Sequence, residues 1–247
     1  MNRDPQLDAR DLVAELFPQA VWAVLAGSVT TAQRTAGSDL DIVVLLPDQD
    51  PQAPHRDSRH YRGWPVELFV HDRQTLELYL AKDLPARRPV MHRMLATGIP
   101  LLGDPDQWQI RCAAVLAAGP TPLSPDERRW ARYCLTDILD DLVHATDPGE
   151  RTVIAAAAWT ETARQALALS GHWTGNGKWL LREIRDLDRD LADRWLAAQG
   201  DVTAIESLIL DLLDHHGGPL FDGYHLPGER PGGQDERRPA NPAPHPG

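Results

Sequence analysis

Two aspartates, Asp39 and Asp41, stand on either side of a leucine at the start of an apolar run, Ile42–Leu46. Such a run indicates a buried strand, and residues two positions apart in a strand point to the same side. The two carboxylates therefore share one side of the expected strand, while Leu40 points into the core on the other. A strand built only for packing would not begin with two carboxylates, so the pair is a candidate for binding a cation.

A third acid, Glu67, lies among apolar residues in the later segment Val66–Val70. If the two strands are neighbours, Glu67 lies beside the aspartates. Three carboxylates that converge on one sheet surface repel one another unless a cation lies between them. Oxygen ligands in this number suit Mg²⁺, which also bridges the phosphates of substrates. Two such ions, about 3.5–4 Å apart, stabilise the attacking and leaving oxygens of a phosphoryl transfer.

A glycine–serine pair, Gly27-Ser28, ends an earlier apolar run and precedes Asp39 by ten intervening residues. Glycine lets the backbone approach a ligand closely, and the following amides with the serine hydroxyl can hold phosphate oxygens. Alone, each motif is weak, because Gly-Ser often follows a strand and paired aspartates often lie in turns or in solvent. Together with the later acid, they indicate chemistry on a nucleoside triphosphate.

This block resembles the signature of the polymerase-beta-type nucleotidyltransferase superfamily, which has Gly-Ser, then Ser/Thr-Asp-x-Asp, then a third acid on a later strand. Ser38 supplies the residue before the first aspartate. Within the superfamily, the chain is most similar to aminoglycoside adenylyltransferases that modify streptomycin and spectinomycin, whose strand has the form V-E-x-x-x-V-H-D. Here residues 66–72 read VELFVHD. The resemblance is close over residues 20–75 and holds only in outline over the later helices.

The resemblance implies transfer of AMP from ATP to a hydroxyl of an aminoglycoside-like small molecule, with release of pyrophosphate, and hence a link to antibiotic resistance. Asp39 and Asp41 would then bind magnesium, and Gly27, Ser28 and Ser38 would bind the nucleotide. The ligands implied are therefore Mg²⁺ and ATP, the latter as substrate.

The third acid has two possible roles. In many superfamily members it is an aspartate and a metal ligand, whereas in the aminoglycoside group it is a glutamate that acts as base on the acceptor hydroxyl. Glu67 matches the second pattern, and its longer side chain extends past the metals toward an acceptor. A role as a third metal ligand remains the alternative.

Three more residues are candidates for the site. Lys178, in a chain with only one other lysine, begins a helix after Gly-Asn-Gly and could neutralise the triphosphate, as a helical-domain lysine does in related enzymes. The alternative is an ordinary exposed helix start. Arg34, in the loop after Gly-Ser, could contact phosphate or be solvated. Glu161 lies among small apolar residues of a helix and could bind a cationic acceptor or serve as an alternative base. It could instead pair with Arg164 or another arginine.

The first part of the chain has the pattern of an α/β (α+β) domain with a mixed sheet and helices on one face. The first expected helix covers 8–17, and a second, covering 72–97, is broken at Pro85 or Pro89. Strands are expected at 21–28, 38–47, on both sides of a turn at Gly63-Trp64-Pro65, and at 98–104 as an edge strand. The proline-rich segment 47–57 indicates a loop.

After about residue 105 the strand signals stop and helical periodicity takes over. Ser124-Pro125-Asp126-Glu127 is typical of a helix start. Further helices are expected after residue 147, over 178–199 and over 201–216. We therefore expect a nucleotidyltransferase-like domain over 1–120, an all-α helical bundle over 121–226 that covers substrate and nucleotide, and a disordered tail over 227–247.

Composition narrows the class of protein. The chain has 247 residues, 42% hydrophobic and 25% charged, with a formal net charge of −11. No apolar run approaches the length of about 20 residues that a helix needs to cross a bilayer, and the sequence has no apolar signal-peptide core. We therefore expect a cytoplasmic protein without a membrane partner. The acidity argues against nucleic acid as partner, because phosphate backbones bind basic surfaces. We expect a monomer or a homodimer.

Two other functions remain open. The acceptor could be a protein side chain or an RNA end, as in antitoxin-type minimal nucleotidyltransferases, but these lack a long helical half. The chain could also be a catalytically inactive nucleotide-binding protein, which predicts a broken carboxylate set, whereas all three acids are present here. The motifs indicate the reaction better than they indicate the acceptor.

Overall fold

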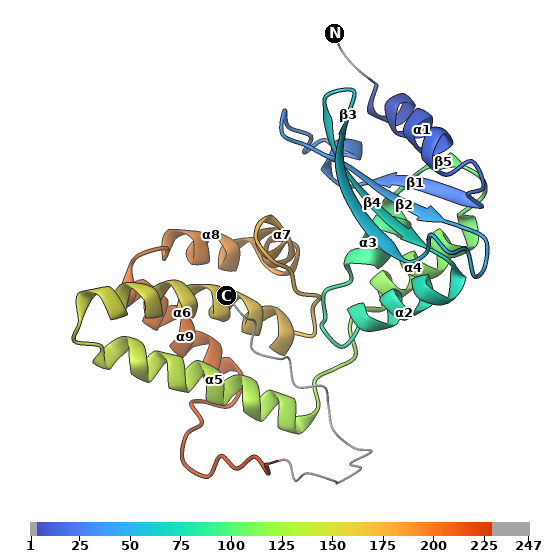
Figure 1. The fold of residues 1–247 in the computed structure, drawn as a ribbon. Helices are drawn as coiled ribbons and strands as arrows, with labels where there is room; N and C mark the ends of the chain where they lie inside the picture. Colours follow the sequence, from blue (N-terminus) through green and yellow to red (C-terminus); the bar gives the residue numbers. More distant parts are fainter. Residues whose placement is uncertain (1–3, 229–247) are drawn as a thin grey trace. The chain divides into compact units, whose positions relative to one another are not determined.

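The computed structural model describes residues 4–228 of the chain (Figure 1). The chain divides into two compact units between Ala118 and Gly119, two residues before the boundary expected from the sequence. The expected tail over 227–247 lies outside the described residues except for its first two.

The first unit is built on a five-stranded sheet in the order β3-β4-β2-β1-β5. Its strands are β1 (Trp22–Ala26), β2 (Leu40–Leu45), β3 (His55–Tyr61), β4 (Trp64–His71) and β5 (Ile99–Leu102). β2 and β4 are parallel, and the other neighbouring pairs are antiparallel. The sheet is therefore mixed, as the sequence predicts, and β5 is an edge strand, also as predicted.

Helices cover both faces of this sheet, so the expectation of helices on one face was wrong. They are α1 (Pro5–Leu16), α2 (Arg73–Asp83), α3 (Val90–Thr97) and α4 (Asp106–Ala118). Buried residues of α1 pack with Leu40 and Ile42 on one face, and those of α2, α3 and α4 pack with Val43 and Leu45 on the other (Figure 1). The physical reason is that β2 is apolar on both sides, and a strand of this kind needs a cover on both.

The hairpin between β3 and β4 also differs from the expectation. Its turn is Arg62-Gly63, with φ of 49° and 86°, and this left-handed pair matches the two-residue turns that suit the twist of hairpin strands. The expected turn at Gly63-Trp64-Pro65 was therefore wrong, because the last two residues belong to β4. Residues 55–57, expected in a loop, belong to β3. Pairing of β4 with β2 begins only at Val66, so the missing amide of the proline breaks no bond on that side.

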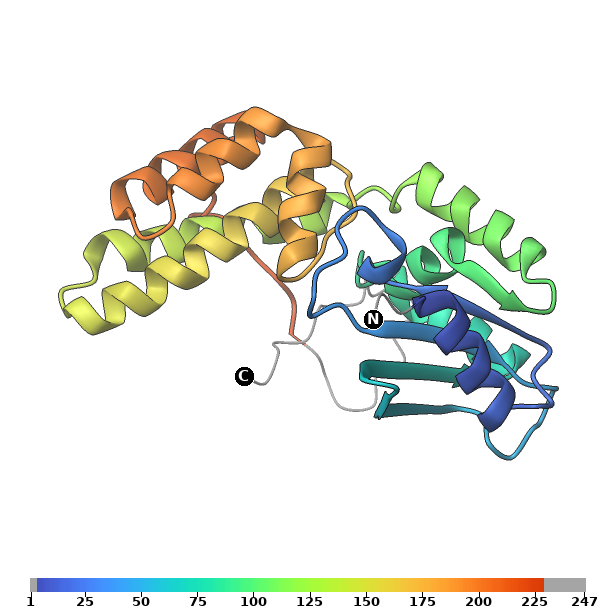
Figure 2. The ribbon, with the colours of Figure 1, turned by 90° about the horizontal axis from the view of Figure 1, so that it is seen from above.

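The second unit contains helices as its only regular elements between Gly119 and residue 228. They are α5 (Pro125–His144), α6 (Pro148–Leu169), α7 (Lys178–Leu187), α8 (Arg189–Ala197) and α9 (Val202–His215). The long helices α5 and α6 lie side by side (Figure 2). Ser124 and Glu127 form a reciprocal capping box at the start of α5, as the sequence pattern indicates. The stretch 178–199 is two helices, because Asp188 accepts the amides of Asp190 and Leu191 and starts α8.

The core of the second unit is lined by leucine, isoleucine and alanine side chains from all five helices. Trp159 and Trp195 stack with ring centroids 4.0 Å apart, and each indole N–H donates to the other residue's carbonyl oxygen at 2.7 Å. This pair satisfies both indole N–H groups and fixes α6 against α8. Over residues 4–228, the structure contains no helix with the length and apolar character needed to cross a bilayer.

Candidate functional site

The parallel strands β2 and β4 bring the three predicted acids together. Asp41 lies directly opposite Glu67 in the register of the two strands, and Asp39 immediately precedes β2. One carboxylate oxygen from each acid lies within 4.8 Å of the others, and all three residues are partly buried. Over the described residues 4–228, no other group of three or more acidic, histidine or cysteine side chains is close enough to hold a metal ion.

The two sides of β2 explain why the acids are held where they are. Leu40 and Ile42 are fully buried in the core beneath α1, while Val43 and Leu45 are buried beneath the helices on the other face. Asp41 is on the same face as Val43 because it is two positions away. The strand is thus anchored by apolar side chains on both faces, and the carboxylates lie at its start.

Gly27, directly after β1, lies against Asp41 of this cluster. It has φ 79° and ψ −170°, a backbone region that is essentially restricted to glycine. A Cβ at this position would lie 2.0 Å from Oδ2 of Asp41. Two independent constraints therefore require glycine here. One is the backbone conformation of residue 27, and the other is the lack of space for a Cβ beside Asp41.

Two serine hydroxyls close the loop that separates β1 from β2. Oγ of Ser28 and Oγ of Ser38 are 2.9 Å apart, and the backbone amide of Thr35 donates to Oγ of Ser38 at 2.9 Å. Ser38 is buried, so its hydroxyl holds the loop closed. The nucleotide contacts expected for Ser28 and Ser38 stay predictions.

A basic residue that the sequence did not indicate pairs with the third acid. The guanidinium of Arg56, on β3, donates to Oε2 of Glu67 at 2.6 Å, and it lies over the ring of Phe69 at 4.8 Å from the centroid. This residue was missed because segment 47–57 was interpreted as a loop. The contact between Arg56 and Glu67 could have been predicted only from the register of β3 against β4. That register could not be inferred, because the charged sequence of β3 has no alternation of polar and apolar residues.

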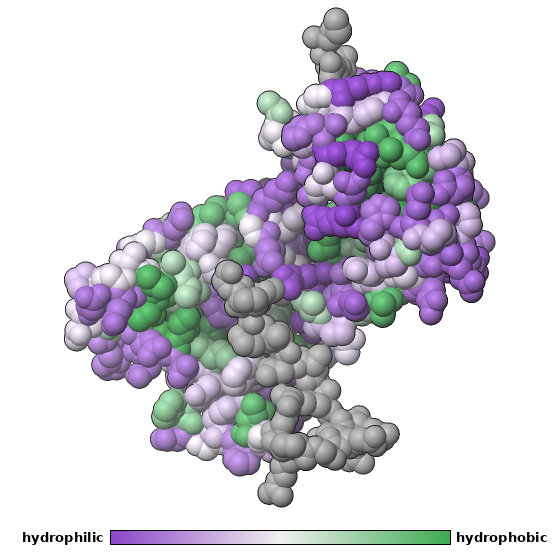
Figure 3. All heavy atoms as spheres, viewed as in Figure 1, coloured by the Kyte–Doolittle hydropathy of each residue, from purple (hydrophilic) through white to green (hydrophobic). Residues whose placement is uncertain are grey.

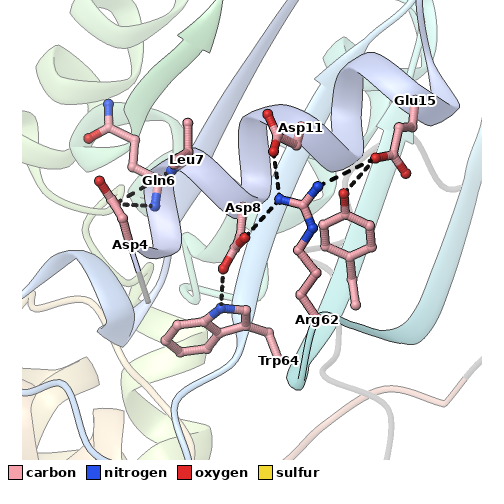
Figure 4. Close-up of polar contacts among 9 residues, drawn as sticks. Asp4, Gln6, Leu7, Asp8, Asp11, Glu15, Arg62 and Trp64 are labelled. Atoms are coloured by element: carbon pink, nitrogen blue, oxygen red, sulfur yellow. Dashed lines mark hydrogen bonds and ion pairs between the residues drawn. The ribbon is translucent and has the colours of Figure 1, made fainter. Parts of the chain in front are cut away.

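Arg34 lies in the exposed part of the loop, with its guanidinium over the ring of Trp64 at 5.1 Å from the centroid. The Trp64 indole N–H donates to Oδ2 of Asp8 at 3.0 Å. Asp8 and Asp11 also accept from Arg62 in the β3–β4 turn, at 3.1 and 2.6 Å (Figure 4). These bonds raise the pKa of the Arg62 guanidinium above its usual value and tie the hairpin to α1.

The rest of the VELFVHD motif has structural roles. Asp72 caps α2 in a reciprocal capping box with Thr75, and the Thr75 amide lowers the pKa of the Asp72 carboxyl. Burial lowers the pKa of His71 to about 4, and its ring packs against Tyr79 with centroids 4.9 Å apart. His71 lies opposite Leu45, at the far end of β2 from the acids. Within this motif, only Glu67 joins the carboxylate cluster.

The second unit holds the two remaining predicted residues. Lys178 is the exposed first residue of α7, and its role in nucleotide binding stays a prediction. Oε1 of Glu161 accepts from the side chain of Gln165 at 2.6 Å, and Oε2 lies 3.9 Å from Arg164. The structure thus contains the intrahelical partners that the alternative interpretation of Glu161 requires. Its role in binding the acceptor also stays a prediction.

A groove of about 470 Å³ lies elsewhere in the second unit, between the start of α6 and the turn that leads into α9. Its walls are mostly small or apolar, with Ala155, Ala156, Trp159 and Val202 among them. None of the residues predicted to bind nucleotide or acceptor lines it. On the face seen in Figure 3, apolar patches alternate with hydrophilic residues over the second unit, whereas hydrophilic residues predominate over the first.

The acid cluster has the donor set that magnesium prefers, since all three groups offer hard carboxylate oxygens. Ligand atoms on one Mg²⁺ lie at about 2.0–2.1 Å from it, so two of them can be at most about 4.2 Å apart. The observed limit of 4.8 Å is only slightly larger. Partly buried side chains can close this difference by small rotations, so the residues fit the ion.

The comparisons with known proteins give little beyond this geometry. No protein-family model matches the sequence, and no curated protein is significantly similar to it. Among solved structures, a nucleotidyltransferase-like protein from Exiguobacterium sibiricum 255-15 aligns with a TM-score of 0.44 and 14% sequence identity, over 86% of this chain and 75% of that one. At this level of similarity, the site is interpreted from its own residues alone.

Proposed function

We propose that the chain is a magnesium-dependent nucleotidyltransferase that moves AMP from ATP to a hydroxyl of a small, aminoglycoside-like molecule. The observation that supports it best is the convergence of Asp39, Asp41 and Glu67 within 4.8 Å, where the start of β2 lies beside the parallel strand β4. Gly27, whose conformation excludes a side chain, lies directly against this cluster. An acidic cluster beside an open backbone suits a metal-bound triphosphate.

In the proposed site, Asp39 and Asp41 hold the magnesium, and Gly27-Ser28 approach the triphosphate. The bound ion would neutralise charge on the phosphates during transfer. Gly27 contributes by having no side chain, so that phosphate oxygens can reach the backbone that follows it. Positioning and charge neutralisation account for most of the catalysis in such chemistry.

The proposed reaction is an in-line displacement at the α-phosphorus. The acceptor hydroxyl oxygen forms a bond to this phosphorus while the bond to the bridging oxygen of the β-phosphate breaks. The products are the adenylylated acceptor and pyrophosphate. Glu67 takes the proton from the acceptor hydroxyl and releases it to solvent, which balances the reaction. A third metal ligand is the other role open to Glu67.

Arg34 and Lys178 are proposed as further contacts to the nucleotide, and Glu161 as a contact to a cationic acceptor. These three assignments rest on the sequence. The structure adds that the guanidinium of Arg34 lies on an aromatic ring and that Glu161 has partners within its own helix.

The test uses the purified full chain with ATP labelled at the α-phosphate and MgCl₂. The acceptors are a panel that includes streptomycin and spectinomycin, a metabolite extract, total protein and total RNA. Transfer of label to a small molecule, with one pyrophosphate released per transfer, is the expected result. Transfer of label to protein or RNA would support the proposed nucleotidyl transfer but would show that the acceptor is a macromolecule and not a small molecule. Absence of both transfer and ATP binding would overturn the proposal.

A further inference from the structure

The ion pair between Arg56 and Glu67 is made possible by the register of β3 and β4. Arg56 lies directly opposite Phe69, and Ser58 lies directly opposite Glu67. Arg56 therefore reaches Glu67 along the diagonal of the antiparallel pair, a distance that long side chains span. The small side chain of Ser58 leaves this path open.

The guanidinium of Arg56 is held from two directions. The ring of Phe69 supports it at 4.8 Å from the centroid, and Oε2 of Glu67 accepts from it at 2.6 Å. A planar guanidinium that both stacks and donates to a carboxylate has less freedom than an exposed ammonium. Arg56 thus defines where the Glu67 carboxylate points, although the arginine side chain itself is 59% exposed.

This pairing changes what Glu67 can offer to a cation. With Oε2 engaged by a guanidinium, the carboxylate has one oxygen less for other partners and much of its charge is already compensated. No basic partner is seen for Asp39 among the hydrogen bonds and ion pairs of the described residues, so the acids are not equivalent ligands. Because Glu67 already has a positive partner, it is a poorer metal ligand than Asp39.

We infer that Arg56 is a positioning residue for Glu67: by engaging Oε2 it weakens Glu67 as a metal ligand and leaves the carboxylate at the edge of the cluster, available to the acceptor hydroxyl. The inference rests on the proposed function and makes it more specific, because it assigns Glu67 as the base. Without Arg56, Glu67 would join the two aspartates as a third ligand, which would strengthen metal binding and impair proton transfer. A residue with only a structural role would change both properties in the same, unfavourable direction.

The first experiment measures metal binding without turnover. The nucleotide-free chain is titrated with Mn²⁺, a spectroscopic substitute for Mg²⁺, and free Mn²⁺ is followed by electron paramagnetic resonance. Arg56→Gln should bind Mn²⁺ roughly three- to tenfold more tightly than the unmodified chain, since a repelling charge is lost and a ligand is gained. Glu67→Gln alone should change the affinity by less than about threefold. In the double variant, the part of the gain that comes from Glu67 as an added ligand should disappear, and only the smaller part from the lost charge should remain.

Arg59→Gln is the matched control. Arg59 lies on the same edge strand but opposite Val66, hence on the other face of the sheet, where it pairs with Asp57. This variant should bind Mn²⁺ like the unmodified chain. Arg56→Lys keeps the positive charge but loses the planar guanidinium with its paired N–H donors, so it should give an intermediate affinity for Mn²⁺. Circular dichroism of every variant verifies folding.

The second experiment measures turnover with whichever acceptor is labelled. Arg56→Gln should lower kcat tenfold or more and change KM for ATP less than twofold, with partial recovery in Arg56→Lys. Weaker Mn²⁺ binding in Arg56→Gln, a gain that persists undiminished in the Glu67→Gln background, or an unchanged kcat would each overturn the inference. If the unmodified chain binds metal and transfers AMP, such a result leaves the proposed function standing. If it binds neither Mn²⁺ nor ATP, both fail.

Discussion

Replacing Gly27 with alanine should separate the stability of the chain from its ability to bind metal. The backbone of Gly27, at φ 79° and ψ −170°, costs roughly 1–3 kcal/mol for a residue with a side chain. Alanine also lowers the conformational entropy of the unfolded chain, which stabilises the folded state by about 0.4–1 kcal/mol. The free energy of unfolding should therefore fall by only about 1–2 kcal/mol.

The effect on the site should be larger. The new Cβ would lie 2.0 Å from Oδ2 and 2.9 Å from Cγ of Asp41. Because an aspartate side chain can rotate, the clash is relieved by turning this carboxylate away from the other two acids. A site that loses one of its two proposed metal-binding aspartates should bind Mn²⁺ at least about tenfold more weakly, which corresponds to about 1.4 kcal/mol.

Gly37→Ala is the control for this prediction, because Gly37 lies in the same loop without a left-handed φ and its added Cβ would come no closer than 4.0 Å to Thr35. Urea denaturation followed by circular dichroism measures stability, and Mn²⁺ titration measures the site. If Gly27→Ala binds Mn²⁺ as tightly as Gly37→Ala, the reasoning from the Gly27–Asp41 contact is refuted. If the free energy of unfolding falls by more than about 3 kcal/mol, the substitution disrupts the fold and not only the site.

Three further predictions follow from single contacts. Asp41→Asn, which keeps size and removes charge, should weaken Mn²⁺ binding tenfold or more with an unchanged circular dichroism spectrum; unchanged affinity would exclude Asp41 as a ligand. Ser38→Ala removes a hydroxyl with two partners and should lower the urea-derived free energy of unfolding by about 1–2 kcal/mol, more than Ser28→Ala does. The pKa of His71 is lowered from 6.5 to about 4 by burial, so the unfolded chain binds a proton first and stability should fall as pH drops from 6.5 toward 4. In His71→Phe, which keeps a ring against Tyr79, the urea midpoint should lose this part of its pH dependence; an identical profile would contradict the assignment.

The strands that carry the aspartates could be predicted from the sequence because their apolar runs are long and end in clear breaks. Gly27, Asp39 and Asp41 were recognisable from these runs, and Glu67 from an acid placed inside an apolar segment. The start of α5 was equally clear, since Ser124 and the residues after it carry the whole capping pattern, whereas the start of α8 at Asp188 was missed within the single helix expected over 178–199. Local side-chain chemistry decides these features, so a local pattern is sufficient to find them.

Features that depend on long-range packing were missed. β3 is an exposed edge strand of charged residues, and only its pairing with β4 identifies it as a strand. The turn at Arg62-Gly63 places a non-glycine residue at positive φ, which propensity disfavours, but bonds from α1 hold that arginine in position. Arg56 follows from the same pairing. Its contact with Glu67 exists only because two strands of separate sequence adopt one particular register.

The alternation along β2 has a consequence for misfolding. A slip of β2 by one position against its neighbours would exchange its two faces. Asp39 and Asp41 would then replace Leu40 and Ile42 beneath α1, in a core where both leucine and isoleucine are fully buried. Each unpaired carboxylate placed there would cost several kcal/mol. The same acids proposed to hold magnesium therefore also penalise the nearest competing strand pairing.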